Sequence, residues 1–120
     1  MSQPIVWIDI PVRDLDRAIR FYGEVLGQPV RREQFAGAAL GVLTHEGGTA
    51  GGCLYASETD RPSDHGPLLY FNCNGRLDQA IAAAQRSGGR VLEGKHAIAG
   101  HGHRAVVLDS EGNRIALHSS

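Results

Sequence analysis

The stretch WIDIPVRDLDRAIRFYGEVLG, residues 7–27, decides the architecture because part of it returns further along the chain. The pattern LDxAI at 15–19 recurs at 77–81, and Gly27 recurs at the same offset as Gly89. A strand-like apolar run precedes each copy, and short apolar runs separated by glycine follow it. An internal repeat of this length indicates a fold built from repeated units. We therefore predict a single domain, 1–120, made of two modules, about 1–57 and 66–120, with the polar segment 57–66 as the connector.

The first copy predicts a helix over residues 14–26. The Asp14 carboxylate can accept from the free N–H groups of the first turn, as an N-cap does. From Leu15 onward, apolar residues recur at the i, i+3, i+4, i+7 spacing of one helical face. Gly27 supplies a left-handed stop, and Pro29 prevents the helix from continuing.

The second copy predicts the same helix, and each module adds four strands. This helix begins near Leu77 with Asn74 or Gly75 as its cap, and Gly88 and Gly89 end it. The strands are expected at 5–12, 28–33, 37–44 and 50–56, and at 68–73, 89–93, 103–109 and 113–118. Each module is thus βαβββ. This order excludes a doubly wound parallel sheet, which needs strict β/α alternation.

Composition excludes several classes of partner. The 120 residues are 42% hydrophobic and carry a net charge of −1, which is typical of a globular chain and gives no electrostatic footprint for nucleic acid or an anionic membrane. No apolar run is long enough to span a bilayer, and the first residues lack the pattern of a signal peptide. We expect a soluble cytoplasmic protein whose two cysteines, Cys53 and Cys73, are reduced thiols.

The residues 7–27, the segment LLYFNCNGRLDQAIAAAQRSGGRVLEGK and the ending VVLDSEGNRIALHSS resemble the vicinal oxygen chelate superfamily. That superfamily contains glyoxalase I, bleomycin-resistance proteins and extradiol dioxygenases. The resemblance covers nearly the whole chain. It implies an α+β fold in which two βαβββ modules form curved mixed sheets around a cup.

Metal-using members of the superfamily hold one divalent ion in the cup with histidines and carboxylates. The resemblance places those ligand positions at Trp7, Cys53, Leu68 and Ala116. Indole N–H only donates, and the leucine and alanine side chains have no polar atom. A lone thiol falls short of the three or four ligands that a stable site needs. We therefore predict no metal ion and no cofactor.

The alternation of side chains along a strand predicts what else lines the cup. If Trp7 points in, Asp9 does too, while Val6, Ile8 and Ile10 pack under the helix. The whole predicted lining is mostly apolar, with a few polar groups, as in small-molecule sites: Trp7, Asp9, Cys53, Tyr55, Leu68, Tyr70, Asn72, Arg114, Ala116 and His118.

The roles of these residues stay open. Trp7 either binds a ligand or fills the space an ion would take. Asp9 either pairs with a cation such as Arg114 or acts as a base. His118 lies two residues from the C-terminus, where fraying is expected. Cys53 is a candidate nucleophile, although the sequence places no base beside it. No catalytic residue is assigned.

Three histidines, His96, His101 and His103, fall close together in GKHAIAGHGHR. The glycines between them predict a mobile loop at the rim of the cup. Such a loop either contributes His101 or His103 to a bound ligand or, with His45 or His65 as a further ligand, forms a metal site.

The sequence thus predicts a glyoxalase/bleomycin-resistance-like protein, metal-independent, that binds a small partly apolar molecule in its cup. One alternative is a metal-dependent lyase, isomerase or dioxygenase with ligands shifted to His96, His101, His103, Asp9 or Cys53. Another is an interaction module without a small ligand. The unsatisfied strand edges of two modules, and the habit of the superfamily, also predict a symmetric homodimer whose cups are completed across the interface.

Overall fold

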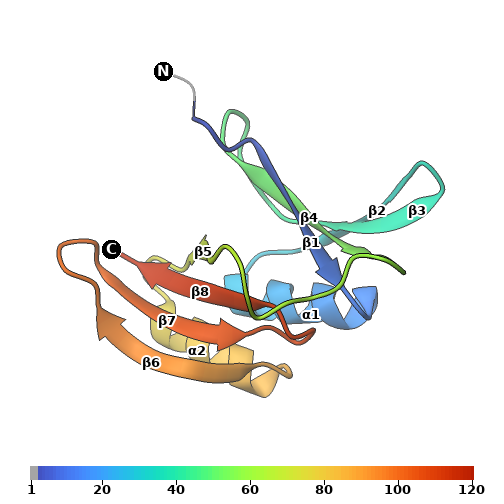
Figure 1. Ribbon diagram of the computed structural model, residues 1–120. Helices are drawn as coiled ribbons and strands as arrows, with labels where there is room; N and C mark the ends of the chain where they lie inside the picture. The colour runs from blue at the N-terminus through green and yellow to red at the C-terminus, as the bar shows by residue number, and fades with distance from the viewer. Residues whose placement is uncertain (1–2) are drawn as a thin grey trace.

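The computed structural model describes residues 3–120, and its elements follow one another in two matching runs (Figure 1). The first run is β1 (Trp7–Val12), α1 (Leu15–Leu26), β2 (Arg31–Phe35), β3 (Ala38–Val42) and β4 (Gly51–Ala56). The second run is β5 (Leu69–Asn72), α2 (Leu77–Arg86), β6 (Arg90–Ala97), β7 (His103–Leu108) and β8 (Arg114–Ser119). The predicted βαβββ repeat is confirmed.

Each run forms its own four-stranded mixed sheet. The strand orders are β1-β4-β3-β2 and β5-β8-β7-β6, so the two sheets have the same topology. In each, the first strand lies parallel to the last, and the other neighbours are antiparallel. The sheets open away from each other and do not hydrogen-bond together in the described part of the chain (Figure 1). The predicted α+β class is therefore confirmed. The outer strands of the two sheets, β1, β2, β5 and β6, each have one unpaired edge in the described part of the chain.

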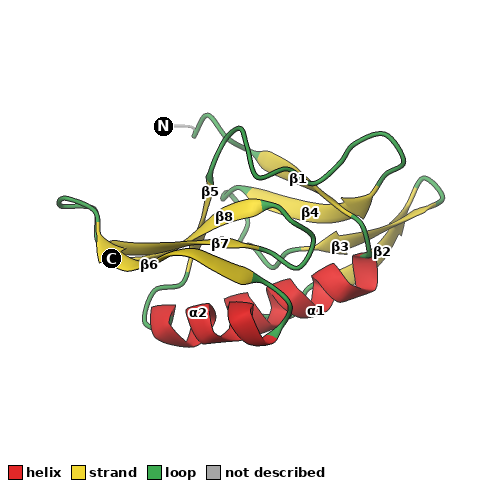
Figure 2. Ribbon diagram, turned by 60° about the horizontal axis from the view of Figure 1, so that its bottom comes forward, coloured by secondary structure: helices red, strands yellow, loops and turns green. Residues whose placement is uncertain are grey.

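Both helices lie on the same side of the sheets (Figure 2). Helix α1 begins as predicted, because Asp14 Oδ1 accepts from the backbone N–H of Arg17 at 3.1 Å. It ends at Gly27, whose φ of 67° is the left-handed conformation that glycine adopts most readily. The apolar face of α1 is buried: the side chains of Phe21 and Tyr22 have no exposed surface.

One core serves both modules. It takes Ile10 and Val12 from β1, Ile115 and Leu117 from β8, and the buried faces of α1 and α2. Phe71 of β5 packs against the ring of Tyr22, with centroids 5.5 Å apart. Since these residues alternate with the predicted cup residues, the predicted cup residues lie on the opposite face of each sheet, here called the helix-distal face.

Several local predictions were wrong. Arg76, not Asn74 or Gly75, is the N-cap of α2 and makes no side-chain capping bond. Asn74 instead accepts from the backbone N–H and hydroxyl of Ser120, because β8 runs parallel beside β5 and brings the chain end next to it. Val6 is 75% exposed, since the strand starts only at Trp7 and helix α1 does not reach back that far.

Two strands differ from the expected bounds by three residues or more at one end. β2 starts three residues later than predicted, at Arg31, because Pro29 lacks the N–H that a ladder needs. β6 runs on to Ala97, and register shifts within its pairing to β7 accommodate the extra residues.

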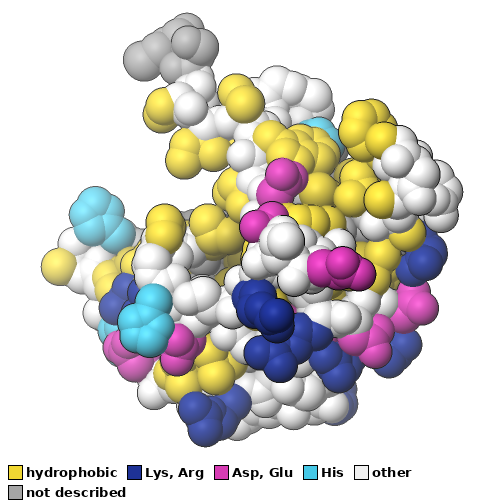
Figure 3. Space-filling model, turned by 45° about the vertical axis from the view of Figure 1, so that its right-hand side comes forward, with side chains coloured by type: hydrophobic (Ala, Val, Ile, Leu, Met, Phe, Trp, Pro, Cys, Tyr) yellow, Lys and Arg dark blue, Asp and Glu magenta, His cyan; other side chains and the backbone are white. Residues whose placement is uncertain are grey.

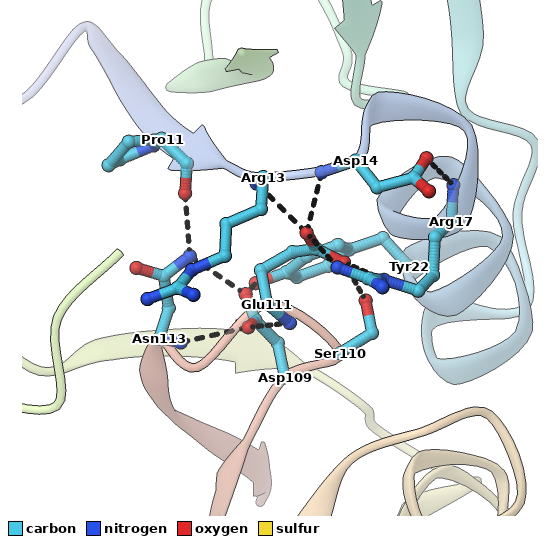
Figure 4. A network of polar contacts seen from close by, with 9 residues as sticks. All are labelled: Pro11, Arg13, Asp14, Arg17, Tyr22, Asp109, Ser110, Glu111 and Asn113. Atoms are coloured by element: carbon cyan, nitrogen blue, oxygen red, sulfur yellow. Dashed lines mark hydrogen bonds and ion pairs between the residues drawn. The ribbon is translucent and has the colours of Figure 1, made fainter. Parts of the chain in front are cut away.

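A polar network fastens the second module to the first (Figure 4). The Glu111 carboxylate accepts from the backbone N–H groups of Arg13 and Asp14 and from the Arg17 guanidinium. Asn113 donates to the carbonyl of Pro11, and Tyr22 donates to Asp109 at 2.6 Å. The turn between β7 and β8 is thereby tied to the junction of β1 and α1. Sequence reasoning did not find this network.

The described helices include none with the length and apolar character needed to cross a membrane.

Candidate functional site

The predicted cup residues of the first module form one cluster on the helix-distal face. Asp9 lies at its centre: its Oδ1 accepts from the indole N–H of Trp7 at 2.9 Å and from the thiol of Cys53 at 3.3 Å. Tyr55 donates instead to Asp60 at 2.8 Å. Trp7 remains 44% exposed and stacks edge-on against His45, so it does not fill a closed core.

Cys53 is a poor nucleophile in this cluster. Its thiol is buried, and burial followed by the hydrogen bond to Asp9 raises its pKa to about 11. The thiol is therefore protonated at neutral pH, whereas thiol nucleophiles react as thiolates. Cys73 lies in the core with its pKa raised by burial, as expected for a packing residue.

The predicted cup residues of the second module form a separate cluster. The strand register places Tyr70 beside Ala116 and Asn72 beside His118. The ring of Tyr70 meets that of His118 with centroids 6.0 Å apart. Leu68 stands half-buried just before β5, and Ala116 is fully buried.

Asp9 and Arg114, proposed as partners, form no ion pair among the described residues. Arg114 instead donates to the carbonyl of Gly66 at 3.2 Å, and its Nε is buried without a partner in the described part of the chain. The two clusters therefore remain apart: no hydrogen bond or ring contact within residues 3–120 joins them.

A cavity of about 480 Å³, open to solvent, lies over the second cluster. Two of the predicted cup residues line it, together with His101 of the predicted rim loop. The complete lining is Tyr70, Ile98, His101, Arg104 and His118. Of the other rim-loop residues, His96 lies in β6 and His103 in β7, so the loop proper is only the turn between them.

Arg104 is the cavity residue that sequence reasoning missed. It lies directly across the ladder from His118 and from His96. Alternation along β7 alone does not tell which of its residues face the cup, and only the pairing with β8 puts Arg104 on the same face as His118. Its guanidinium donates to the Tyr70 hydroxyl, and its Nε donates to His96 Nε2 at 3.1 Å.

His118 is held in place although it lies near the C-terminus. Its Nε2 lies 2.6 Å from the carbonyl oxygen of His101, and its own carbonyl accepts from the N–H of Cys73. Asn74 anchors Ser120 beyond it. The expected fraying is therefore wrong, because the chain end pairs in β8 and is tied down after it.

A larger cleft, of about 650 Å³, lies between the modules on the helix side of the first sheet. Its apolar floor includes Ile8, Leu26, Leu43 and Phe71. The surface is hollowed between the two parts of the molecule, with hydrophobic side chains along the hollow (Figure 3). Asn72 and Tyr70 reach its rim, but the predicted cup residues of the first module do not line it.

No group of three or more His, Cys, Asp or Glu side chains within residues 3–120 is placed to hold a metal ion. His96 contacts backbone and Arg104 rather than another histidine. Neither His45 nor His65 joins the rim-loop histidines: His45 stacks on Trp7, and His65 contacts Asp64.

The family model of the Glyoxalase/Bleomycin resistance protein/Dioxygenase superfamily matches residues 4–117. The chain therefore belongs to this superfamily, and at the positions that the resemblance links to the family's metal it has Trp7, Cys53, Leu68 and Ala116. No curated protein sequence matches it.

Solved structures share the fold at low sequence identity. A glyoxalase/bleomycin resistance protein from Albidiferax ferrireducens T118 is 17% identical with a TM-score of 0.76, covering 98% of this chain and 99% of that one. Fosfomycin resistance protein FosX from Mesorhizobium loti is 15% identical with a TM-score of 0.67, covering 100% and 94%. A glyoxalase I variant from Zea mays is 18% identical with a TM-score of 0.72, covering 97% of this chain but 46% of that one.

Proposed function

We propose that this chain binds a small, partly apolar molecule on the helix-distal face of its second sheet, without using a metal ion. The observation that carries the proposal is the cavity over Tyr70, Arg104 and His118. Its volume falls within the range of small-molecule sites, and its lining combines a ring and an aliphatic side chain with a few hydrogen-bonding groups. Cys53 takes no nucleophilic role in this function, because its thiol is protonated at neutral pH.

We infer further that a second copy of the chain completes the cup. Each cluster occupies one sheet. The large hydrophobic residues Ile5, Val6, Trp7 and Tyr70 are exposed on or just before β1 and β5, two of the four strands with an unpaired edge. The chain exposes 7278 Å², against roughly 6,300 Å² for a compact monomer of its mass. The excess is close to the ~800 Å² that each partner buries in a standard interface.

The binding proposal is tested by screening a library of small organic fragments against the labelled protein by heteronuclear NMR. We expect bound fragments to shift the amide signals of Tyr70, Ile98, Arg104 and His118. Shifts confined to Ile8, Leu26 and Leu43 would place the ligand in the cleft between the modules and contradict the proposed site. A library that shifts no signals would favour the interaction-module alternative.

Metal independence is tested on the purified protein by elemental analysis and by unfolding with and without chelator. We expect no stoichiometric divalent ion and the same melting temperature after EDTA treatment. One equivalent of tightly held nickel, zinc or iron, with a fall in melting temperature on chelation, would restore the metal-dependent alternative, since a metal that binds only the folded state stabilises it.

A further inference from the structure

We propose that the molecule bound in the second-sheet cavity is an organic anion, a carboxylate on a small apolar body, and that Arg104 binds its charged end. The inference rests on the proposed function and assigns the chemical class of its ligand. It starts from the charge of the cavity. Arg104 is the one charged side chain in the lining, and its side chain is 23% exposed.

The positive charge of Arg104 is only weakly compensated. The single carboxylate within ion-pair distance in the described chain is that of Glu93, 3.9 Å away and itself 57% exposed. Exposed pairs at this separation contribute little. A carboxylate that displaced water from the guanidinium would therefore form the stronger ion pair.

The guanidinium is also held in a fixed orientation before any ligand arrives. His96 Nδ1 lies 2.8 Å from the carbonyl oxygen of Gly94, and a carbonyl can only accept, so Nδ1 carries the hydrogen. His96 Nε2 is then the acceptor for Arg104 Nε. On the other side the guanidinium donates to Tyr70 and lies 5.8 Å from the centroid of that ring.

These contacts leave donors for a ligand. Arginine has five N–H groups, and the bonds to His96 and Tyr70 and the long contact to Glu93 account for three. One N–H then remains on each terminal nitrogen, and two terminal N–H groups can donate to the two oxygens of a planar carboxylate. Preorganisation lowers the entropy lost when that pair forms.

The rest of the lining fits the body of such a ligand. The side chain of Ile98 and the ring of Tyr70 offer apolar contact beside the guanidinium. His118 donates through Nε2 to the carbonyl of His101, so its ring is held in place beside the cavity. A small aryl or branched alkyl group attached to a carboxylate matches this arrangement.

The test uses pairs of probes that differ only in charge: phenylacetate and phenylacetamide, and 4-methylpentanoate and its amide. Dissociation constants are measured by NMR titration on the unmodified protein and on Arg104→Gln, with Arg90→Gln as the matched control, since Arg90 is an exposed arginine on β6. Inorganic phosphate is titrated as a further probe. Melting temperatures show whether each variant is folded, and Arg104→Lys, which keeps the charge, replaces Arg104→Gln if that variant is not.

We expect the acids to bind more tightly than their amides, and Arg104→Gln to weaken the acids about tenfold while leaving the amides and the Arg90→Gln control unchanged. With Arg104→Lys, we expect a smaller loss of affinity, and only for the acids. If the amides bind as tightly as the acids, or if Arg104→Gln does not change the affinity for the acids, the proposal that the ligand is an anion is wrong. The proposed function would remain intact. Phosphate that binds as tightly as the acids would contradict the proposal that the ligand is an organic molecule. If no probe shifts the cavity signals, both the inference and the proposed site are wrong.

Discussion

Glu111 is a carboxylate whose side chain has no exposed surface, placed where one module meets the other. Burial alone would raise its pKa. The hydrogen bonds from Arg17, from the Asp14 N–H, from the Ser110 hydroxyl and from the Arg13 N–H outweigh that effect and lower the pKa to about 2. A depressed folded-state pKa stabilises the fold above the unfolded-state pKa near 4.5, and this stabilisation is lost as pH falls toward 2.

Replacing Glu111 by glutamine should therefore remove a pH-dependent stabilisation of about 3 kcal/mol. We expect Glu111→Gln to lower the free energy of unfolding by that amount at pH 6. The difference from the unmodified protein should shrink steadily between pH 4.5 and pH 2. Urea unfolding across this range measures it.

The control for this prediction is Glu58→Gln, since Glu58 is an exposed glutamate on the connector. It should change stability by less than about 0.5 kcal/mol at every pH. A loss in Glu111→Gln that stays constant down to pH 2 would contradict the assigned ionised state of Glu111.

At the scale of elements, Gly27 and Gly89 occupy equivalent positions of the repeat but have different structural roles. Gly27 ends α1 in a left-handed conformation, whereas in the second copy Gly88 has the positive φ of 99°. At Gly89, a Cβ would lie 2.5 Å from the carbonyl oxygen of Leu108 and 2.8 Å from that of Ala84. Gly89 therefore allows the end of α2 to approach β7 closely.

Gly89→Ala should lower the free energy of unfolding by about 1–3 kcal/mol, because two backbone carbonyls must move to admit the methyl group. Gly94→Ala is the matched control in β6, where a Cβ meets nothing within 4 Å and φ is not positive. It should be neutral or slightly stabilising. Equal effects of the two substitutions in chemical denaturation would show that α2 and β7 are not in close contact.

At the scale of the whole molecule, the open arrangement of the two sheets bears on the proposed dimer. Light scattering should give a mass twice the 12.8 kDa of the chain. Val6→Asp places a charge among the apolar residues at the start of β1 and should give a monomer, since an unpaired carboxylate is costly to bury in an interface.

Phe35→Asp is the matched control for the dimer, because Phe35 is 71% exposed but belongs to the hairpin of β2 and β3. It should leave the mass unchanged. A particle of 12.8 kDa for the unmodified protein at high micromolar concentration would remove the dimer and, with it, the cup completed by a partner.

For the candidate site, the sequence predicted only which side chains of a single strand share a face. Alternation placed Tyr70 and His118 on one face and Ile115 on the other, because successive side chains of a strand point in opposite directions. Arg104 required the pairing of β7 with β8, and its fixed guanidinium required the register of β6 as well. Contacts such as Asp9 with Cys53 or Glu111 with Arg17 join residues far apart in the chain, and no local pattern specifies them.

The sequence by itself determined the repeat, the two βαβββ modules and the end of α1 at Gly27. These follow from periodicity, backbone conformation and side-chain chemistry, which act over a few residues. Only the tertiary structure decided that the two halves of the expected cup stand on separate sheets and that Glu111 joins the modules. Those features depend on how the helices pack beneath the sheets, where long-range contacts set the geometry.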